Sequence, residues 1–266
     1  MSFLLKARSE PNQSRSPSSE ELQEKIVHVR ELLGSLIAEM PAFLSDTTIR
    51  RFLRARNWST EQATKSLKET VKWRRQYRPE KICWEDIAEK DYEGRRAYIA
   101  DYLDAKGRCV LVSKPAIKAK VSGKEQIKYL VYILEILAMN SADEQEEHVT
   151  CLLDCKGWAI SNTPLSITRE SINIVQNYYP GMIAVAILSN TPRIFESFWK
   201  VKFVYTNNPE SQKIVFEMFD MDKLETAFGG RNELTVDIES YAERMKRADL
   251  VRGASSMGRD INLVKL

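Results

Sequence analysis

The first ninety residues show the apolar spacing of helices. Between residues 19 and 39 apolar side chains recur every three or four positions, which predicts one helix, and Pro41 follows it. The same spacing predicts a short helix over 46–56 (DTTIRRFLRAR) and a longer one over 59–78 (STEQATKSLKETVKWRRQYR). Residues 1–18 lack this periodicity and become rich in Ser and Pro, so we expect a disordered tail there.

The pattern changes to strands near residue 98. Tyr98–Leu103 and Cys109–Val112 are strand-like and are joined by DAKGR, which predicts a hairpin that turns at Gly107. Farther along, near-continuous apolar strands alternate with helical segments, an arrangement typical of a parallel sheet covered by helices. The predicted order is a helix over 124–139, a strand over 148–155, a mostly helical segment over 164–179, a strand over 182–188, a helix over 192–200 and a strand over 201–206.

These elements predict an α/β fold in which a helical N-terminal module packs on a mixed, mainly parallel sheet with flanking helices. We place the helical module at residues 19–84, the sheet domain at 85–242 and a C-terminal tail at 243–266. Across the last boundary, the spacing of Tyr241 and Met245 predicts an amphipathic helix over 237–248 that docks on the sheet.

One junction does not fit its neighbours. The aromatic residues before Lys200 have helical spacing, whereas the chain alternates as a strand from Val201 onward. Helix-to-strand links usually take about 2–6 residues and often contain Gly, but no residue separates the two segments here. Either the helix is a single frayed turn or a connecting piece is missing from this chain.

The composition is that of an ordinary globular chain, since 43% of its 266 residues are hydrophobic and 29% are charged. The longest apolar run, Met182–Leu188, has seven residues, against about 20 for a membrane-spanning helix. The N-terminus lacks the apolar stretch of a signal peptide. With four cysteines, the simplest expectation is a cytoplasmic chain with reduced thiols.

The sequence offers little for catalysis or metal binding. Its two histidines, His28 and His148, show no paired spacing, and Cys151 and Cys155 stand in a strand-like run that is more typical of a core. The motifs GxSxG, GxGxxG and GxxxxGK[ST] do not occur in it. We therefore expect no enzymatic activity, no metal and no cofactor.

The segment 46–81 is basic. It has eleven Lys or Arg and four Asp or Glu, an excess of +7 against +3 for the whole chain, and four of its arginines lie between Arg50 and Arg56. Two explanations stay open: a site for headgroup phosphates or a membrane surface, because a guanidinium matches phosphate oxygens, or a solvated helix face, which is the more common case. Nucleic-acid binding is not expected, because aromatic interleaving and overall basicity are weak.

Two further features leave alternatives open. The apolar residues of the predicted strands and of the helix that faces them can form either a filled core or the lining of a cavity. Asp154 ends a strand before the turn at Gly157. Ligands tend to bind at this edge of an open α/β sheet, but an acid at such a position is as often a turn former.

Six motifs occur in order along the chain: IRRFLRARNWSTEQATKSLKETVKWR, YLDAKGRCVLVSKP, LLDCKGW, NYYP, RIFESFWK and AFGG. Together they resemble the CRAL-TRIO lipid-binding family, in particular plant members similar to the yeast secretory phosphatidylinositol/phosphatidylcholine transfer protein. The resemblance implies that the sheet and its helices enclose a lipid pocket. It also implies a monomer that binds a phospholipid of this class, associates transiently with membrane surfaces, and transfers the lipid or presents it to lipid-modifying enzymes.

The resemblance also assigns residues to the lipid site. Arg56 falls on the arginine of the family's headgroup site, the turn at Asp154 matches a DLKG-like motif, and Ser161 matches a polar position of the pocket wall. The acyl chains are expected to contact apolar residues of the strands and the facing helix. These are Leu152, Ile187, Phe195, Phe198 and Phe203.

The chain departs from the family pattern in three places. Asn57 replaces a Lys that often follows the arginine, and Gly181 follows NYYP where a Glu commonly helps to hold the inositol headgroup. Family members also carry a segment with a Lys-Pro-Phe-Leu run that begins a gate helix, where this chain passes from Lys200 to Val201. We therefore expect impaired transfer, as in a splice variant. The alternative is a lipid sensor or interaction protein with the same fold.

Overall fold

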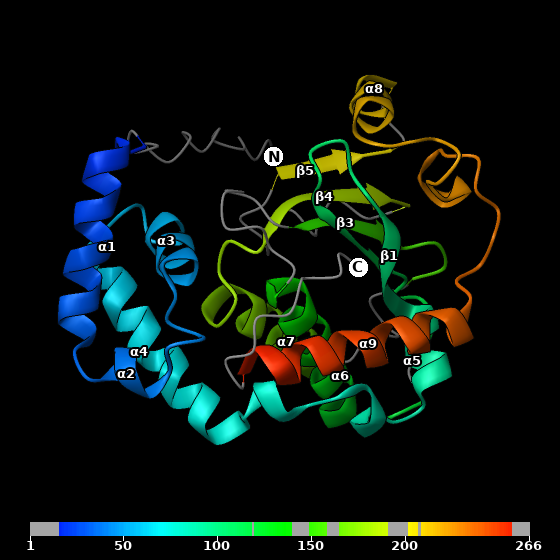
Figure 1. Cartoon of the computed structure of the whole chain (residues 1–266). Helices are drawn as coiled ribbons and strands as arrows, with labels where there is room; N and C mark the ends of the chain where they lie inside the picture. The colour runs from blue at the N-terminus through cyan, green and yellow to red at the C-terminus, as the bar shows by residue number, and fades with distance from the viewer. Residues whose placement is uncertain are drawn as a thin grey trace, which may run out of the picture. The chain divides into compact units, whose positions relative to one another are not determined.

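A computed structural model describes residues 16–118, 120–139, 149–158, 165–190, 202–206 and 209–256 (Figure 1). The chain forms two compact units that divide between Val71 and Lys72, inside helix α4 (Thr60–Tyr77). The predicted domain boundaries after residues 18, 84 and 242 stay predictions.

The first unit is helical, as predicted. Ser18 caps its first helix, because the Ser18 hydroxyl accepts a hydrogen bond from the Glu21 N–H and the Glu21 carboxylate accepts one from the Ser18 N–H. Gly34, at φ 58°, ends this helix, so the single helix predicted over 19–39 is broken in two. The helices are α1 (Ser19–Leu33), α2 (Leu36–Glu39), α3 (Asp46–Ala55) and the first part of α4.

Three helices of this unit bury their apolar faces against one another. Each contributes residues at the three- or four-residue spacing of one helix face. The buried residues are Ile26, Val29 and Leu33 of α1, Ile49, Phe52 and Leu53 of α3, and Ala63, Leu67 and Val71 of α4. Arg51 is buried as well, so the basic segment is not a uniformly solvated face.

The second unit is built on a five-stranded sheet in the order β1-β2-β3-β4-β5 (Figure 1). β1 and β2 form the predicted antiparallel hairpin, with Gly107 at positive φ in its turn, and β2 to β5 run parallel to one another. The predicted mixed, mainly parallel sheet is therefore confirmed. The strands are β1 (Ala97–Leu103), β2 (Cys109–Ser113), β3 (Val149–Asp154), β4 (Ile183–Ser189) and β5 (Lys202–Tyr205).

Helices and short turns cover this sheet. The helices predicted over 124–139 and 164–179 are present as α6 and α7, which contact each other. α5 and α8 were not predicted: α5 has only seven residues and is mostly polar, whereas the apolar residues of α8 fall within 214–218 in its second half. The helices of this unit are α5 (Lys90–Arg96), α6 (Gly123–Met139), α7 (Leu165–Asn177), α8 (Pro209–Met218) and α9 (Ile238–Ser256), with 3-10 turns η1 (Pro79–Lys81), η2 (Trp84–Asp86) and η5 (Thr226–Phe228).

The C-terminal helix α9 confirms the amphipathic helix predicted over 237–248. It packs against α5, α6 and η2, and its Met245 is fully buried. The helix continues to Ser256, within the region predicted as a tail. Asp249 holds this second half, because its carboxylate accepts a hydrogen bond from the Trp84 N–H at 2.6 Å.

Pairing in register places two rows of side chains on one face of the sheet, with one residue from each of β2, β3 and β4 in each row. The rows are Leu111–Cys151–Ala186 and Ser113–Leu153–Leu188. Because side chains alternate between the two faces of a strand, Leu152 and Ile187 point to the opposite face. There η5 lies against β3 and β4.

Three predicted site residues and one predicted element lie outside the described residues. They are Ser161, Phe195, Phe198, and the helix over 192–200 with its junction at Lys200 and Val201. Phe203 lies in β5, whose register pairs it with Ala186 of β4.

Candidate functional site

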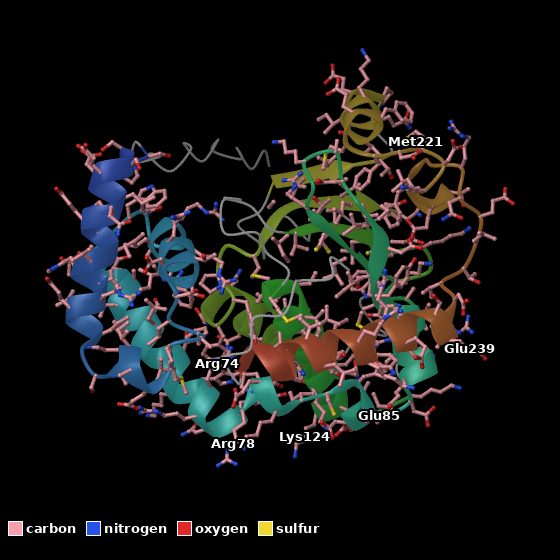
Figure 2. The ribbon with its side chains drawn as sticks, in the orientation of Figure 1. Arg74, Arg78, Glu85, Lys124, Met221 and Glu239 are labelled. Atoms are coloured by element: carbon pink, nitrogen blue, oxygen red, sulfur yellow. The ribbon has the colours of Figure 1, made fainter. Side chains whose placement is uncertain are left out.

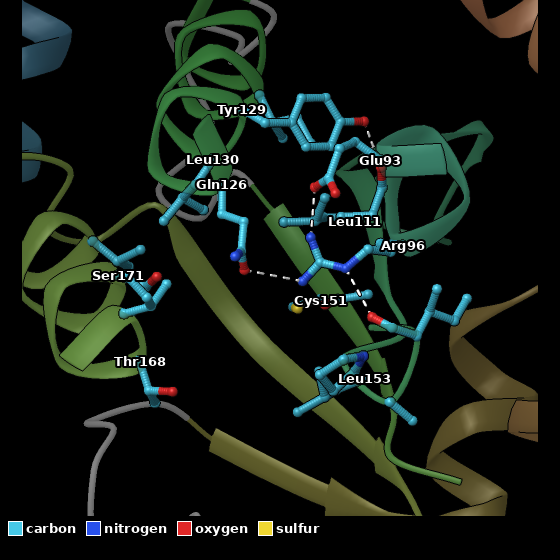
Figure 3. Close-up of a pocket in the computed structure, with 18 of the residues that line it drawn as sticks. Glu93, Arg96, Leu111, Gln126, Tyr129, Leu130, Cys151, Leu153, Thr168 and Ser171 are labelled. Atoms are coloured by element: carbon cyan, nitrogen blue, oxygen red, sulfur yellow. Dashed lines mark hydrogen bonds and ion pairs between the residues drawn. The ribbon is translucent and has the colours of Figure 1, made fainter. Parts of the chain in front are cut away.

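A cavity of about 690 Å³ lies between one face of the sheet and helices α6 and α7 (Figure 3). Its floor is formed by the two rows of side chains from β2, β3 and β4, which are apolar or small apart from the Ser113 hydroxyl. The described residues that line the cavity all belong to the second unit. Its size falls in the range of roughly 300–1,000 Å³ that is typical of small-molecule sites.

Two helices close the cavity on the side away from the sheet. α6 contributes Leu130 and Ile133 among others, and α7 contributes Thr168, Ser171 and Ile172. Residues three or four apart lie on the same face of a helix, so each helix turns one continuous face to the cavity. The wall is mainly apolar and carries the two hydroxyls of α7.

Three polar side chains converge where α5 meets the cavity (Figure 3). Arg96, at the end of α5, donates from Nη1 to the Glu93 carboxylate at 2.5 Å and from Nε to the Ile117 carbonyl at 2.9 Å. Its Nη2 lies 3.5 Å from Oε1 of Gln126 on α6. Because the positive charge of Arg96 pairs with the negative charge of Glu93, this cluster has no net charge when Glu93 is ionised.

Glu93 is deeply buried, with 1% of its surface exposed. Its Oε2 accepts the bond from Arg96, but its Oε1 has no hydrogen-bond partner among the residues that the structure describes. Burial raises the pKa of the Glu93 carboxyl, and the charge of Arg96 only partly offsets this. A buried acceptor without a donor is uncommon in native proteins, and buried groups with perturbed pKa values tend to mark functional sites.

Two other ionisable groups on the lining are neutral at physiological pH. The Tyr129 hydroxyl donates to the Ala97 carbonyl at 2.6 Å, and burial raises the pKa of Tyr129 well above its usual value. Burial, with a smaller contribution from Cys155, raises the pKa of the Cys151 thiol to about 12. The cavity therefore combines apolar surface with polar groups that carry little net charge.

Such a cavity suits an amphipathic ligand with an apolar body. Each methylene group moved out of water contributes about 0.8 kcal/mol to binding, and the polar groups fix one end of the ligand. Within the described part of the chain, no group of three or more His, Cys, Asp or Glu is placed to hold a metal ion. No helix in that part is long and apolar enough to cross a membrane.

A buried ion pair fixes α6 in the second unit. Arg74 of α4 donates to both oxygens of Glu135 at 2.7 and 2.8 Å, and the Tyr179 hydroxyl donates to Glu135 at 2.6 Å. Burial alone would raise the pKa of Glu135, but the bonds from Arg74 and Tyr179 outweigh it and lower that pKa below its usual value. Arg74, a member of the basic segment, therefore holds the fold together.

The predicted acyl contacts Leu152 and Ile187 are not on the cavity side of the sheet. Both are fully buried in the core, and their neighbours Leu153 and Leu188 line the cavity instead. β3 and β4 do line the cavity, but with the alternate residues, and contact of Leu152 and Ile187 with an acyl chain stays a prediction. The sequence of a near-continuous apolar strand does not show which of its faces lines a cavity, because the two faces have the same apolar character.

The described residues of the predicted headgroup site make local contacts. Asp154 accepts hydrogen bonds from the Lys156 N–H at 2.9 Å and from Nδ2 of Asn190 at 3.2 Å, as a turn former does. Arg56 ends α3 in the first unit, and its Nε donates to the Ser66 hydroxyl at 2.8 Å. Neither residue is among the described residues that line the cavity, and their contact with a headgroup stays a prediction.

Sequence reasoning did not identify Glu93 and Arg96. They stand in KDYEGRRAY, a short polar stretch whose composition matches a solvated loop. The available signal was their position, since an acid and a base three residues apart directly precede a predicted strand. That signal is weak, because charged residues commonly stand at the ends of strands on a protein surface.

Residues 93–230 match the profile of the CRAL/TRIO domain. Over 229 residues the chain is 24% identical to the phosphatidylinositol transfer protein PDR17 of Saccharomyces cerevisiae, and the match covers 79% of this chain and 65% of that protein. It is 28% identical over 243 residues to the SEC14 cytosolic factor of Kluyveromyces lactis, covering 81% of this chain and 80% of that one. The chain thus spans slightly less than two thirds of the length of PDR17.

A solved structure with the same fold is the crystal structure of Sfh5. It aligns with a TM-score of 0.65 and 14% sequence identity, and the alignment covers 92% of this chain and 100% of that one. At this identity the likeness establishes the fold, which agrees with the mixed sheet and flanking helices described here.

Proposed function

The chain belongs to the CRAL/TRIO family, and on this basis we propose that it binds a phospholipid of the phosphatidylinositol/phosphatidylcholine class and transfers it between membranes or presents it to lipid-modifying enzymes. The observation that carries the proposal is the largely apolar cavity between the sheet and helices α6 and α7. The name of the relative PDR17, a phosphatidylinositol transfer protein, supports this ligand class.

Transfer of this kind makes and breaks no covalent bond. An acyl segment of about ten methylene groups gains roughly 8 kcal/mol on burial, because each methylene contributes about 0.8 kcal/mol. Relative to water, that gain holds the lipid in the protein. The acyl chain gains nearly as much in the apolar interior of a bilayer, so moving the lipid from the protein to a membrane changes the free energy little. In this proposal the protein is a cytoplasmic monomer that exchanges its lipid during transient contact with a membrane surface.

We propose that transfer by this chain is impaired. The reason lies in the sequence, where no gate segment separates Lys200 from Val201. A gate covering ~400 Å² of apolar surface would contribute about 10 kcal/mol as an upper bound, at ~25 cal/mol per Å². Loss of about a third of that contribution would weaken lipid retention more than a hundredfold, so we expect residual binding and slow transfer.

A second candidate function is lipid sensing without transfer. Asn57 and Gly181, which replace two headgroup residues of the family pattern, favour it together with the missing gate. Sedimentation with vesicles separates the two candidates when it is combined with transfer kinetics. A sensor binds the vesicles without exchanging lipid, whereas a carrier exchanges it.

Lipid loading measured by mass spectrometry tests the proposal. The purified chain is incubated with vesicles of phosphatidylcholine and phosphatidylinositol, re-isolated, and its bound lipid is quantified. Ser171→Trp places an indole in the cavity and should abolish loading, whereas Arg169→Trp places the same indole on the exposed face of α7 and should not. Equal loading of wild type and Ser171→Trp would show that the lipid binds elsewhere.

A matched insertion tests the impaired transfer. A Lys-Pro-Phe-Leu-type segment inserted after Lys200 should increase lipid retention and the transfer rate by a hundredfold or more. A Gly/Ser segment of the same length controls for the longer connection. Equal transfer by the original chain and the restored one would contradict the proposed impairment.

A further inference from the structure

One oxygen of a buried carboxylate is left unbonded at the cavity. Glu93 lines the cavity and is 1% exposed, and its Oε1 has no hydrogen-bond partner in the described part of the chain. Native proteins bond nearly all buried polar atoms, because a buried acceptor without a donor loses the hydrogen bonds that water gave it. The accessible surface of this oxygen is below 1 Å², so a donor group of a ligand would reach it through a rotation of the Glu93 side chain toward the cavity, and the bond so gained would favour that rotation.

The neighbouring Arg96 is not available to bind a phosphate group. Each of the three guanidinium nitrogens of Arg96 faces an acceptor, on Glu93, Ile117 and Gln126 respectively. A phosphate would have to displace Glu93 from Arg96 while approaching the negative charge of Glu93. Among the described lining residues Lys118 is the remaining charged one, and it is exposed.

The same cluster disfavours a cationic donor. Arg96 holds a positive charge beside Glu93, so a second cation would be repelled at this short range. The quaternary nitrogen of choline, in addition, carries no hydrogen to donate. A hydroxyl group is the neutral donor that satisfies Oε1 without bringing charge into the cavity.

We propose that Oε1 of Glu93 accepts a hydrogen bond from a hydroxyl group of the bound lipid, so that Glu93 sets a preference for lipids with a free hydroxyl. This inference rests on the proposed function, because it requires a lipid in the cavity. The hydroxyl can come from the polyol headgroup of a phospholipid, as in phosphatidylinositol, or from the single hydroxyl of a lipid alcohol such as a sterol. Both present the same chemistry to Glu93.

Competition on the wild-type chain tests the preference without changing the protein. The chain is loaded with pyrene-labelled phosphatidylcholine and mixed with phosphatidylcholine vesicles that contain phosphatidylinositol, a sterol, or the methyl ether of that sterol. The sterol should displace the pyrene lipid at a mole fraction tenfold or more below that of its ether, the factor expected for one hydrogen bond to a charged group. Phosphatidylinositol should displace the pyrene lipid more effectively than phosphatidylcholine does, by a similar factor.

Two variants assign the preference to Glu93. Glu93→Gln keeps the size of the side chain but replaces a charged acceptor with a neutral one, so the preference should fall severalfold. The double variant Glu93→Met with Arg96→Met removes both charges together and should abolish the preference. It replaces Glu93→Gln as the test if that single variant does not fold. Glu239→Gln, at the exposed start of α9, is the matched control and should keep the preference (Figure 2).

The outcomes separate this inference from the proposed function. A preference for phosphatidylinositol alone places the hydroxyl on a headgroup. A preference for the sterol over its ether places the hydroxyl on a lipid alcohol. Either preference supports the inference if the Glu93 variants remove that preference. Retained binding of pyrene phosphatidylcholine with no preference overturns the inference alone. If no lipid binds, the proposed function fails and the inference fails with it.

Discussion

Two buried glutamates of the second unit pair with arginines but differ in how completely they are bonded. Glu135 receives two bonds from Arg74 and one from Tyr179, and its pKa is lowered. Glu93 receives one bond from Arg96, and its pKa is raised. The first carboxylate is satisfied by the fold itself, whereas the second keeps an unbonded oxygen at the cavity, which is why Glu93 is the residue assigned to the ligand.

Removal of Arg96 should destabilise the protein in a pH-dependent way. Arg96→Met leaves Glu93 as an uncompensated buried charge, so the free energy of unfolding at pH 7 should fall by about 3 kcal/mol. The pKa of Glu93, already raised, should rise further. A carboxyl whose pKa is raised in the folded protein stabilises the fold fully at pH values below its usual pKa of about 4.3. This stabilisation is lost as pH rises through the raised pKa of the folded protein.

The deficit of Arg96→Met in the free energy of unfolding, relative to wild type, should therefore shrink as pH falls from 7 toward 5. Urea unfolding of both proteins at the two pH values measures it. Glu93→Met with Arg96→Met carries no carboxyl at this position and should show a smaller deficit at pH 7, which does not shrink as pH falls because the raised pKa of Glu93 stabilises the wild type at lower pH. A deficit of equal size at both pH values for Arg96→Met would contradict the assignment of the effect to Glu93.

The AFGG motif has a steric basis at its last residue. A Cβ atom on Gly230 would lie 1.9 Å from the carbonyl oxygen of Leu224, a backbone atom that cannot move aside cheaply. We therefore expect Gly230→Ala to lower the free energy of unfolding by about 3 kcal/mol or more. Gly253→Ala on α9 meets nothing within 4 Å and should stabilise the helix by about 0.5–1 kcal/mol. Thermal unfolding of the two variants tests the contrast, and similar melting temperatures would contradict it.

At the scale of elements, the Arg74–Glu135 pair joins the second half of α4 to α6. Arg74→Met should lower the free energy of unfolding at pH 7 by about 3–5 kcal/mol, because it leaves a buried carboxylate with a single donor. In the wild type the lowered pKa of Glu135 gives stability above the usual carboxyl pKa, and this stability is lost as pH falls through the native value. Urea unfolding measures the loss, with Lys72→Met on the exposed face of α4 as control. A loss no larger than that of the control would contradict a structural role for Arg74.

Most elements could be predicted from periodicity, but the faces of the central strands could not. The alternation of strands and helices identified β1 to β5, α6 and α7, because their apolar runs are long and distinct. Leu152 was assigned to the lipid although Leu153 lines the cavity, because β3 is apolar on both faces and its sequence does not distinguish them. α5 escaped prediction because seven polar-rich residues show no periodicity, and Arg96 escaped with it.

The whole molecule combines a family fold with a local departure from it. The CRAL/TRIO match, the mixed sheet and the apolar cavity agree on a lipid-binding architecture. The polar groups of the cavity were not among the residues that the family resemblance assigned to the headgroup. The proposed preference for lipids with a free hydroxyl is thus expected to arise at Glu93, while the sheet and α6 and α7 supply the general affinity for lipid.

Photolabelling locates the lipid most directly. Phosphatidylcholine with a diazirine at the end of one acyl chain is loaded from vesicles, irradiated, and the labelled residues are found by tandem mass spectrometry. The label should fall on cavity-lining residues of α6, α7 and β3, such as Ile133, Ile172 and Leu153, and Ser171→Trp should suppress it. Label concentrated on η5, against the other face of the sheet, or on the exposed Leu234 and Leu250 would contradict a lipid site in this cavity.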